Sequence, residues 1–166
     1  EWVQIAALSA DSSQTVPLLK EVLARYDPAK PAYGSLVRRL AAMVGAGKDV
    51  PELHELVSRA VAPGGGEREA EVLNGLSEGF RRRKDTLNIL LNEQPALLEA
   101  VTTHRSNSVR KAALGLLKSG KAIRPELLTR GTENARQIIR NSGLPVEQRS
   151  IAVGILGLDK DLSGQS

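Results

Sequence analysis

Few residues of this chain have the types and spacing that metal binding or acid–base catalysis requires. His54 and His104 are the only histidines, and there is no cysteine. The dipeptide at 54–55 does not open a His-Glu-x-x-His zinc motif, because Ser58 stands where the second histidine would be. A metal site needs several convergent ligands, so we expect both histidines to be ordinary helix or loop residues. The lack of cysteine excludes a disulfide, a thiol nucleophile, a thiolate metal site and covalent haem attachment within this segment.

The other candidate motifs also favour structural roles. The glycine-rich stretch 63–66 lacks the Lys-Ser/Thr pair of a phosphate-binding loop and follows no strand pattern, so we expect a linker. No serine has the Gly-x-Ser-x-Gly setting of an activated nucleophile. Glu67 and Glu71 share one side of a helix while Glu69 turns away, which is typical of an acidic first helical turn. The sequence therefore predicts no catalytic, cofactor-binding or metal-binding residue.

The positive charge of the chain is concentrated in one region. The net charge is +4, whereas residues 101–144 hold nine Lys or Arg and two Asp or Glu, a net charge of +7. Such a region attracts an acidic protein surface or a phosphate backbone, and a solvated surface with helix-end cations is the alternative. If this span folds as adjacent layers, we expect much of the charge to share one face that docks an acidic partner. The candidate residues are Arg110, Lys111, Lys118, Lys121, Arg124, Arg130, Arg136 and Arg140.

A second basic run, Arg81 to Lys84, lies at a predicted helix end. Cations there complement the helix dipole, and contact with a phosphate or an acidic protein is the alternative.

The elements that would position these residues are helices. Apolar residues at 109, 112, 113, 116 and 117 have the one-faced spacing of an amphipathic helix. The phrase returns 39 residues later, where Arg149, Ala152 and Gly154 match Arg110, Ala113 and Gly115. A helical phrase that recurs at about 40 residues indicates a HEAT-type array.

Composition supports this fold class. Hydrophobic residues make up 41% of the 166 residues and aromatic residues only 2%, which suits stacked helices better than a β-sandwich. We predict an all-α, right-handed superhelix of about ten HEAT-like helices, as a single domain over 1–166, with a flexible point near 63–66 and a frayed tail at 159–166. No apolar run approaches the ~20 residues of a membrane helix, so no membrane insertion is expected. Because the chain opens at Glu1 inside a helical phrase, we expect a fragment of a longer protein.

Several helix boundaries can also be predicted. Gly120, Gly131 and Gly143 each follow a polar step, which predicts helices that end there in a left-handed residue. The helices between them are expected at 109–118, 125–130 and 133–141, and a last one runs from 145 to about 158. A capping box at 49–52 should open a helix, and further helices are expected at 1–9 and 85–91.

Several phrases resemble the helical-repeat middle region of the PVC-type haem-binding proteins, membrane-bound dehydrogenases of Planctomycetes and relatives. The phrase at 2–9 is similar to their Trp-Val-Arg-x-Ala-x-Leu-Ser helix, and the phrase at 149–157 resembles their Arg-x-x-Ala-x-x-Leu-Leu-Gly helix. The phrases at 18–19, 40–45 and 73–79 occur in the expected order between them.

The resemblance implies a secreted or periplasmic parent protein. In that family a β-propeller precedes the helical repeats, and a cytochrome c-like domain with a Cys-x-x-Cys-His motif and haem c follows them. This chain has only the helical middle, so no catalytic position is carried over. The resemblance implies a spacer or docking role against neighbouring domains.

Two functions are therefore expected in order of preference. The first is a non-catalytic interaction or spacer module of a larger dehydrogenase-like, cytochrome-containing protein. The alternative is a nucleic-acid-binding array similar to the HEAT-like alkylpurine DNA glycosylases, which the basic region favours. The scarcity of aromatic residues disfavours the alternative, because base-directed chemistry normally uses stacking side chains.

Overall fold

The fold is all-helical. The computed structural model describes residues 12–47, 50–83, 90–120 and 123–163, which contain eight α-helices and no strand. In chain order the helices are α2 (Ser12–Ala24), α3 (Pro31–Ala46), α4 (Val50–Ala60), α5 (Glu67–Arg82), α6 (Gln94–Thr103), α7 (Asn107–Ser119), α8 (Pro125–Arg140) and α9 (Val146–Ser163). The helices expected at 1–9 and the predicted cap at Asp49 lie outside the described residues, as does most of the helix expected at 85–91.

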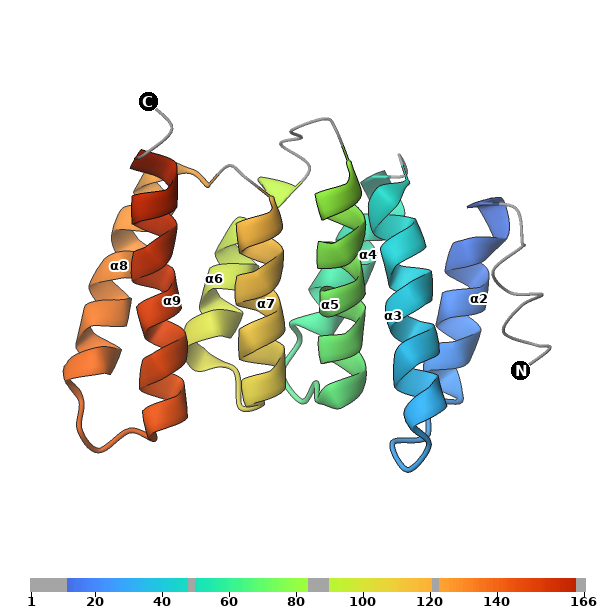
Figure 1. The fold of residues 1–166 in the computed structure, drawn as a ribbon, viewed down its shortest axis with the longest axis horizontal. Helices are drawn as coiled ribbons and strands as arrows, with labels where there is room; N and C mark the ends of the chain where they lie inside the picture. The colour runs from blue at the N-terminus through green and yellow to red at the C-terminus, as the bar shows by residue number, and fades with distance from the viewer. Residues whose placement is uncertain (1–11, 48–49, 84–89, 121–122, 164–166) are drawn as a thin grey trace.

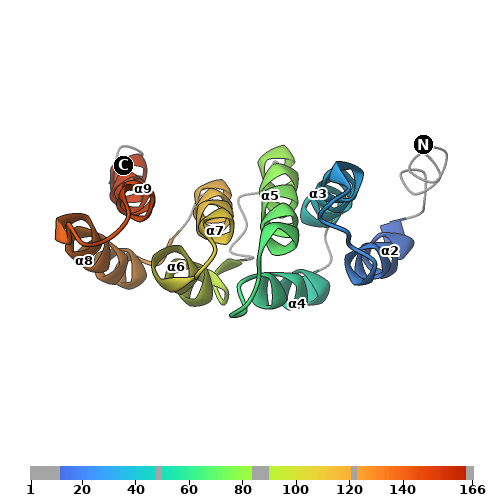
Figure 2. The same cartoon turned by 90° about the horizontal axis from the view of Figure 1, so that it is seen from below.

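The helices form antiparallel pairs that stack side by side in two layers (Figures 1 and 2). The inner layer consists of α3, α5, α7 and α9, which all run in the same direction (Figure 1). The outer layer consists of α2, α4, α6 and α8. Figure 2 shows the outer row bowed, so that the inner layer lies on its concave side.

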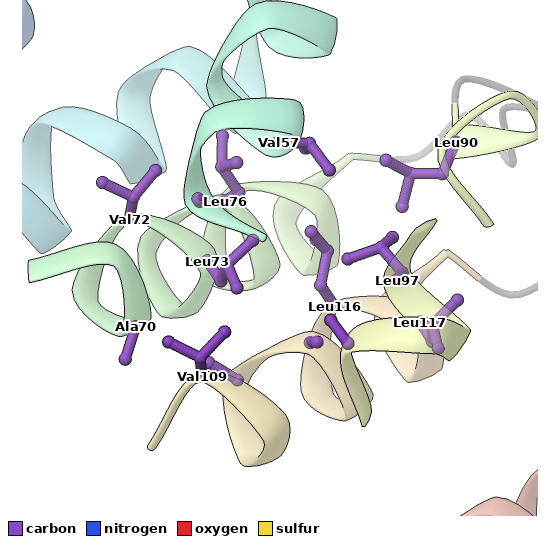
Figure 3. Close-up of a cluster of buried hydrophobic side chains, with 14 of the residues drawn as sticks. Val57, Ala70, Val72, Leu73, Leu76, Leu90, Leu97, Val109, Leu116 and Leu117 are labelled. Carbon is purple, nitrogen blue, oxygen red and sulfur yellow. The ribbon is translucent and has the colours of Figure 1, made fainter. Parts of the chain in front are cut away.

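Side chains from both layers form the core. Leu73, Leu76 and Leu116 of the inner layer are 0% exposed, as is Leu97 of the outer layer. Figure 3 shows these four leucines gathered with Val57 of α4 between the two layers. Full burial of one such side chain contributes about 1.5–3 kcal/mol, so this cluster is a main source of the stability of the array.

The helical phrase that recurs in the sequence occupies neighbouring places in one layer. It forms α7 and α9, which are in contact. All five apolar positions predicted for α7 are buried, from 0% exposure at Val109 to 2% at Leu117. In α9 the matching Ala152 is 2% exposed and Ile155 is 0% exposed.

Glycines bring α3 and α5 into backbone contact. A Cβ atom added to Gly75 would lie 2.3 Å from the carbonyl oxygen of Arg38, and one added to Gly79 would lie 2.3 Å from that of Ala42. From the other side, a Cβ at Gly45 would lie 2.7 Å from the carbonyl oxygen of Leu76. No larger residue fits at these positions without moving a helix.

The prediction of three left-handed glycine ends is wrong. Gly131 does not end a helix, because α8 is continuous from Pro125 to Arg140 and buries Gly131 against Leu98 and Ile155. Gly120 ends α7 with φ −73°, since its N–H bonds to the last-turn carbonyls of Leu116 and Leu117. Among the described glycines, positive φ occurs at Gly64 alone, at 97°.

The predicted tail is also shorter than expected. α9 continues to Ser163, so the helix extends through 159–163 rather than ending near Leu158. The stretch 63–66 forms the turn between α4 and α5, and its expected flexibility stays a prediction.

Candidate interaction surface

Arg110 is buried, so the prediction that it belongs to a docking face is wrong. It is 7% exposed, and its Nε donates a hydrogen bond to the carbonyl oxygen of His104. Burial lowers the pKa of the guanidinium. Arg110 therefore stabilises the turn between α6 and α7 instead of presenting a charge to a partner.

Two of the predicted basic residues lie on the inner layer. Lys111 and Lys118 are exposed along α7. The Nζ atom of Lys111 lies 2.5 Å from Oε1 of Glu147, which links α7 to α9. This hydrogen bond, together with that from Asn107, lowers the pKa of the Glu147 carboxyl.

Three of the remaining predicted residues lie on outer helix α8. Arg130, Arg136 and Arg140 are exposed on α8, and none forms an ion pair with a residue that the structure describes. Arg124 precedes α8 and places Nε 4.0 Å from Glu126. Lys121 lies outside the described residues.

The eight residues therefore do not form one basic face. Since α7 and α8 belong to different layers (Figure 2), their solvent-exposed sides point away from each other. The basic region of the sequence is divided between an inner and an outer surface.

The inner surface is crossed by side-chain pairs between neighbouring helices. Arg38 of α3 binds Glu71 of α5 through both carboxylate oxygens, at 2.7 and 3.3 Å. Ser108 of α7 donates a hydrogen bond to Glu67 of α5, and Lys111 continues the series to α9. Exposed pairs contribute only about 0–1 kcal/mol each, so their main effect is to fix side-chain positions and neutralise charge on this surface.

The inner surface of α7 and α9 also has an apolar part. Val146 is 71% exposed and Val153 is 52% exposed, and they are the exposed large hydrophobic residues of the described chain. A Cβ atom added to Gly115 or to Gly157 would have no atom of another helix within 4 Å, so both glycines face open space. Helical spacing could have revealed this patch, because 146, 150, 153 and 157 lie opposite the buried positions 151, 155 and 158.

Both histidines make contacts between neighbouring helix pairs. His104 is buried, and the N–H of Ser106 donates to its Nδ1 atom at 3.0 Å. Its Nε2 therefore carries the proton and donates to the carbonyl oxygen of Ala62 at 3.2 Å. His54 on α4 contacts the buried carboxylate of Glu93 through Nδ1. The described residues contain no group of three or more His, Cys, Asp or Glu placed to hold a metal ion.

The basic run at the end of α5 contacts protein groups at two of its positions. Arg83 donates to the carbonyl oxygen of Gly47 at 2.6 Å, and Arg81 donates to the hydroxyl of Ser77 at 3.2 Å. Arg82 is exposed, and Lys84 lies outside the described residues. Arg83 thus caps the end of a neighbouring helix, which is a structural role.

Comparisons with protein-family models, with curated proteins and with solved structures found no match to this chain. No helix in the described ranges is long and apolar enough to cross a lipid bilayer.

Proposed function

We propose that this chain is a non-catalytic, HEAT-like helical array that serves as an interaction or spacer module of a larger protein. The observation that supports this is the inner layer, in which four parallel helices present one continuous surface (Figures 1 and 2). Side-chain pairs from Arg38 to Glu147 fix side-chain positions across neighbouring helices of this layer. Extended, pre-organised surfaces of this kind are the usual binding surfaces of helical arrays.

The resemblance of the sequence phrases suggests the larger protein. We propose a secreted or periplasmic, dehydrogenase-like parent that carries haem c in a neighbouring domain. In that setting the array separates and docks the domains on either side of it, and it binds no cofactor itself.

The part of the inner surface on α7 and α9 is the proposed contact. Val146 and Val153 supply exposed apolar area, and Lys118 supplies a positive charge that pairs with no described residue. An acidic neighbouring domain with a small apolar patch complements this surface. Charge complementarity would then mainly accelerate association.

Site-specific photo-crosslinking in the full-length parent protein tests the proposal. A photoreactive amino acid at Gly115 or Val153 is expected to give a defined crosslink to a neighbouring domain or bound protein. The same residue at Asn134, which is exposed on outer helix α8, is the matched control. Absence of crosslinks from the inner positions, or equal crosslinking from Asn134, would contradict the proposal, as would turnover of a sugar or aldehyde by the isolated array.

A second candidate function is nucleic-acid binding. It is favoured by the exposed guanidinium groups of Arg130, Arg136 and Arg140 on α8, which form no ion pair with a described residue. Binding of duplex DNA through three phosphates would weaken with a log–log salt slope of about −2.7. Simultaneous substitution of the three arginines by Gln should then abolish most of that slope, and no binding at low salt removes this candidate.

A further inference from the structure

An open groove of about 430 Å³ lies where the α2–α3 connection meets the first turns of α3 and α5. Its lining includes Tyr26, Lys30, Gly34, Arg38, Glu67 and Glu71. The groove opens at one edge of the inner layer, away from the valine patch on α9.

One wall of the groove is aromatic. Tyr26 packs edge-to-face against Tyr33, with ring centroids 6.3 Å apart and an interplanar angle of 70°. Both rings are partly exposed. The whole chain has one Trp, two Tyr and one Phe; of the two tyrosines, Tyr26 lines the groove and Tyr33 packs against Tyr26. An exposed tyrosine ring attracts cations and planar guanidinium groups.

One carboxylate that lines the groove forms no ion pair with a described residue. Glu71 forms an ion pair with Arg38. The Nζ atom of Lys30 lies 3.6 Å from Oδ2 of Asp27. Glu67 accepts a hydrogen bond from Ser108 but forms no ion pair with any residue in the described ranges. It is exposed and free to bind a cation.

Burial and nearby carboxylates raise the pKa of the Tyr26 hydroxyl. The pKa of Tyr26 is raised first by burial and then by the carboxylates of Glu71, Glu67 and Glu69, although Arg68 lowers it. Three carboxylates therefore lie near this hydroxyl, and the basic residues Lys30 and Arg38 also line the groove.

Gly34 keeps the floor of the groove open. A Cβ atom at this position would lie 3.6 Å from Cγ of Glu71 and 3.7 Å from the hydroxyl oxygen of Tyr26. These are ordinary contacts, so a small residue could fit, but a longer side chain would extend into the space between the tyrosine and the carboxylate.

We propose that this groove binds an arginine side chain of a partner protein, with the guanidinium between Tyr26 and Glu67. Arginine suits the site better than lysine, because its planar group can stack on a ring while it donates two hydrogen bonds to a carboxylate. The inference rests on the proposed function, since the arginine belongs to a protein that the array contacts. The groove would be a second contact of the array and would bind a basic side chain, whereas the proposed contact on α7 and α9 would bind an acidic surface.

An NMR titration of the isotope-labelled chain with N-acetyl-arginine amide tests the groove directly. Saturable shifts are expected at the amides of Tyr33, Gly34 and Ser35, and the neutral isostere N-acetyl-citrulline amide should bind more weakly. Glu67→Gln is expected to weaken arginine binding about two- to fivefold, the range of one exposed ion pair.

A blocking variant and a matched control make the test specific. Gly34→Met should abolish saturable binding while preserving the fold, because methionine is a better helix former than glycine. Gly115→Met places the same side chain on α7, where nothing surrounds the glycine, and should leave binding unchanged.

Three results would overturn the inference: no saturable shift at the groove, equal binding of the citrulline compound, or undiminished binding to Gly34→Met. None of them affects the crosslinking experiment on α7 and α9. Failure of the groove is therefore distinguishable from failure of the proposed function.

Discussion

Arg83, which caps the end of α5, donates a hydrogen bond of 2.6 Å to the carbonyl oxygen of Gly47, which caps the end of α3. A second, longer contact of 3.5 Å reaches the carbonyl oxygen of Gly45. One guanidinium therefore satisfies acceptors that α3 cannot satisfy within itself. Its position, 5.9 Å from the centroid of the Phe80 ring, also keeps it against the core.

Replacing Arg83 by Ala is expected to lower the free energy of unfolding by about 1.5–3 kcal/mol, the usual contribution of a hydrogen bond to a charged group. Urea unfolding followed by circular dichroism at 222 nm measures the change. Arg82→Ala is the control, since Arg82 is exposed in the adjacent position and should change stability by less than about 0.5 kcal/mol. Equal effects of the two variants would show that the helix-end contact contributes nothing.

Gly75 and Gly115 should respond in opposite directions to substitution by Ala. At Gly75 the new Cβ meets the carbonyl oxygen of Arg38 at 2.3 Å, so the free energy of unfolding should fall by about 1–3 kcal/mol as the helices move apart. At Gly115 nothing lies within 4 Å, and Ala should stabilise the helix by about 0.5–1 kcal/mol. Thermal and urea unfolding of both variants checks the signs, and a stable Gly75→Ala variant would contradict the close packing.

His104→Phe should be destabilising although it preserves the size and planarity of the ring. The substitution leaves the N–H of Ser106 without its partner, at a cost of about 1–3 kcal/mol, whereas the carbonyl oxygen of Ala62 still accepts from the N–H of Gly65. Arg105→Ala alters the exposed neighbour and serves as the control. If hydrogen exchange at the Ser106 amide is equally slow in wild type and His104→Phe, the proposed hydrogen-bond role of His104 is wrong.

Glu69 should make stability depend on pH. Burial alone would raise the pKa of its carboxyl, but hydrogen bonds from the N–H of Gly66, at 2.8 Å, and from Arg68 outweigh burial and lower the pKa below its ordinary 4.5. Because the folded-state pKa is depressed, this contribution is complete above pH 4.5 and is lost as pH falls through the folded-state value.

Glu69→Gln should therefore be less stable than wild type at pH 7, and the difference should shrink as the pH falls below 4.5. Urea unfolding at pH 7 and pH 3 measures both differences. Glu99→Gln, at an exposed position of α6, should show no such dependence. A constant difference between wild type and Glu69→Gln at both pH values would mean that the charge of Glu69 is irrelevant.

Helical periodicity predicts the core well, because the buried side of a helix is a local property of spacing. The spacing of the apolar residues at 109, 112, 113, 116 and 117 predicts the buried side of α7, and each of the five is at most 2% exposed. The same periodicity does not predict which glycines end helices, because a glycine ends a helix in one place and lets a neighbouring helix approach in another. Gly131 has the flanking sequence of a helix end, but Leu98 and Ile155 approach it from other helices.

The candidate site could be predicted only in part. Counting charges along the chain identifies a basic region, but successive helices alternate between layers, so neighbours in sequence emerge on opposite surfaces. Arg110 is buried because its side chain donates a hydrogen bond to the carbonyl oxygen of His104, a contact that depends on the geometry of the turn between α6 and α7. The tyrosine groove joins residues 26–38 to residues 67–71, a proximity that no local pattern reveals.

The glycine contact between α3 and α5 also determines how the array responds to force. Backbone atoms that touch directly have no side chains that can rotate to let the helices slide. Between α7 and α9 the close contact at Gly154 is made by the end of the Leu114 side chain, which can change rotamer. We expect a stiff half and a compliant half, so that a spacer pulled from both ends extends first between α7 and α9.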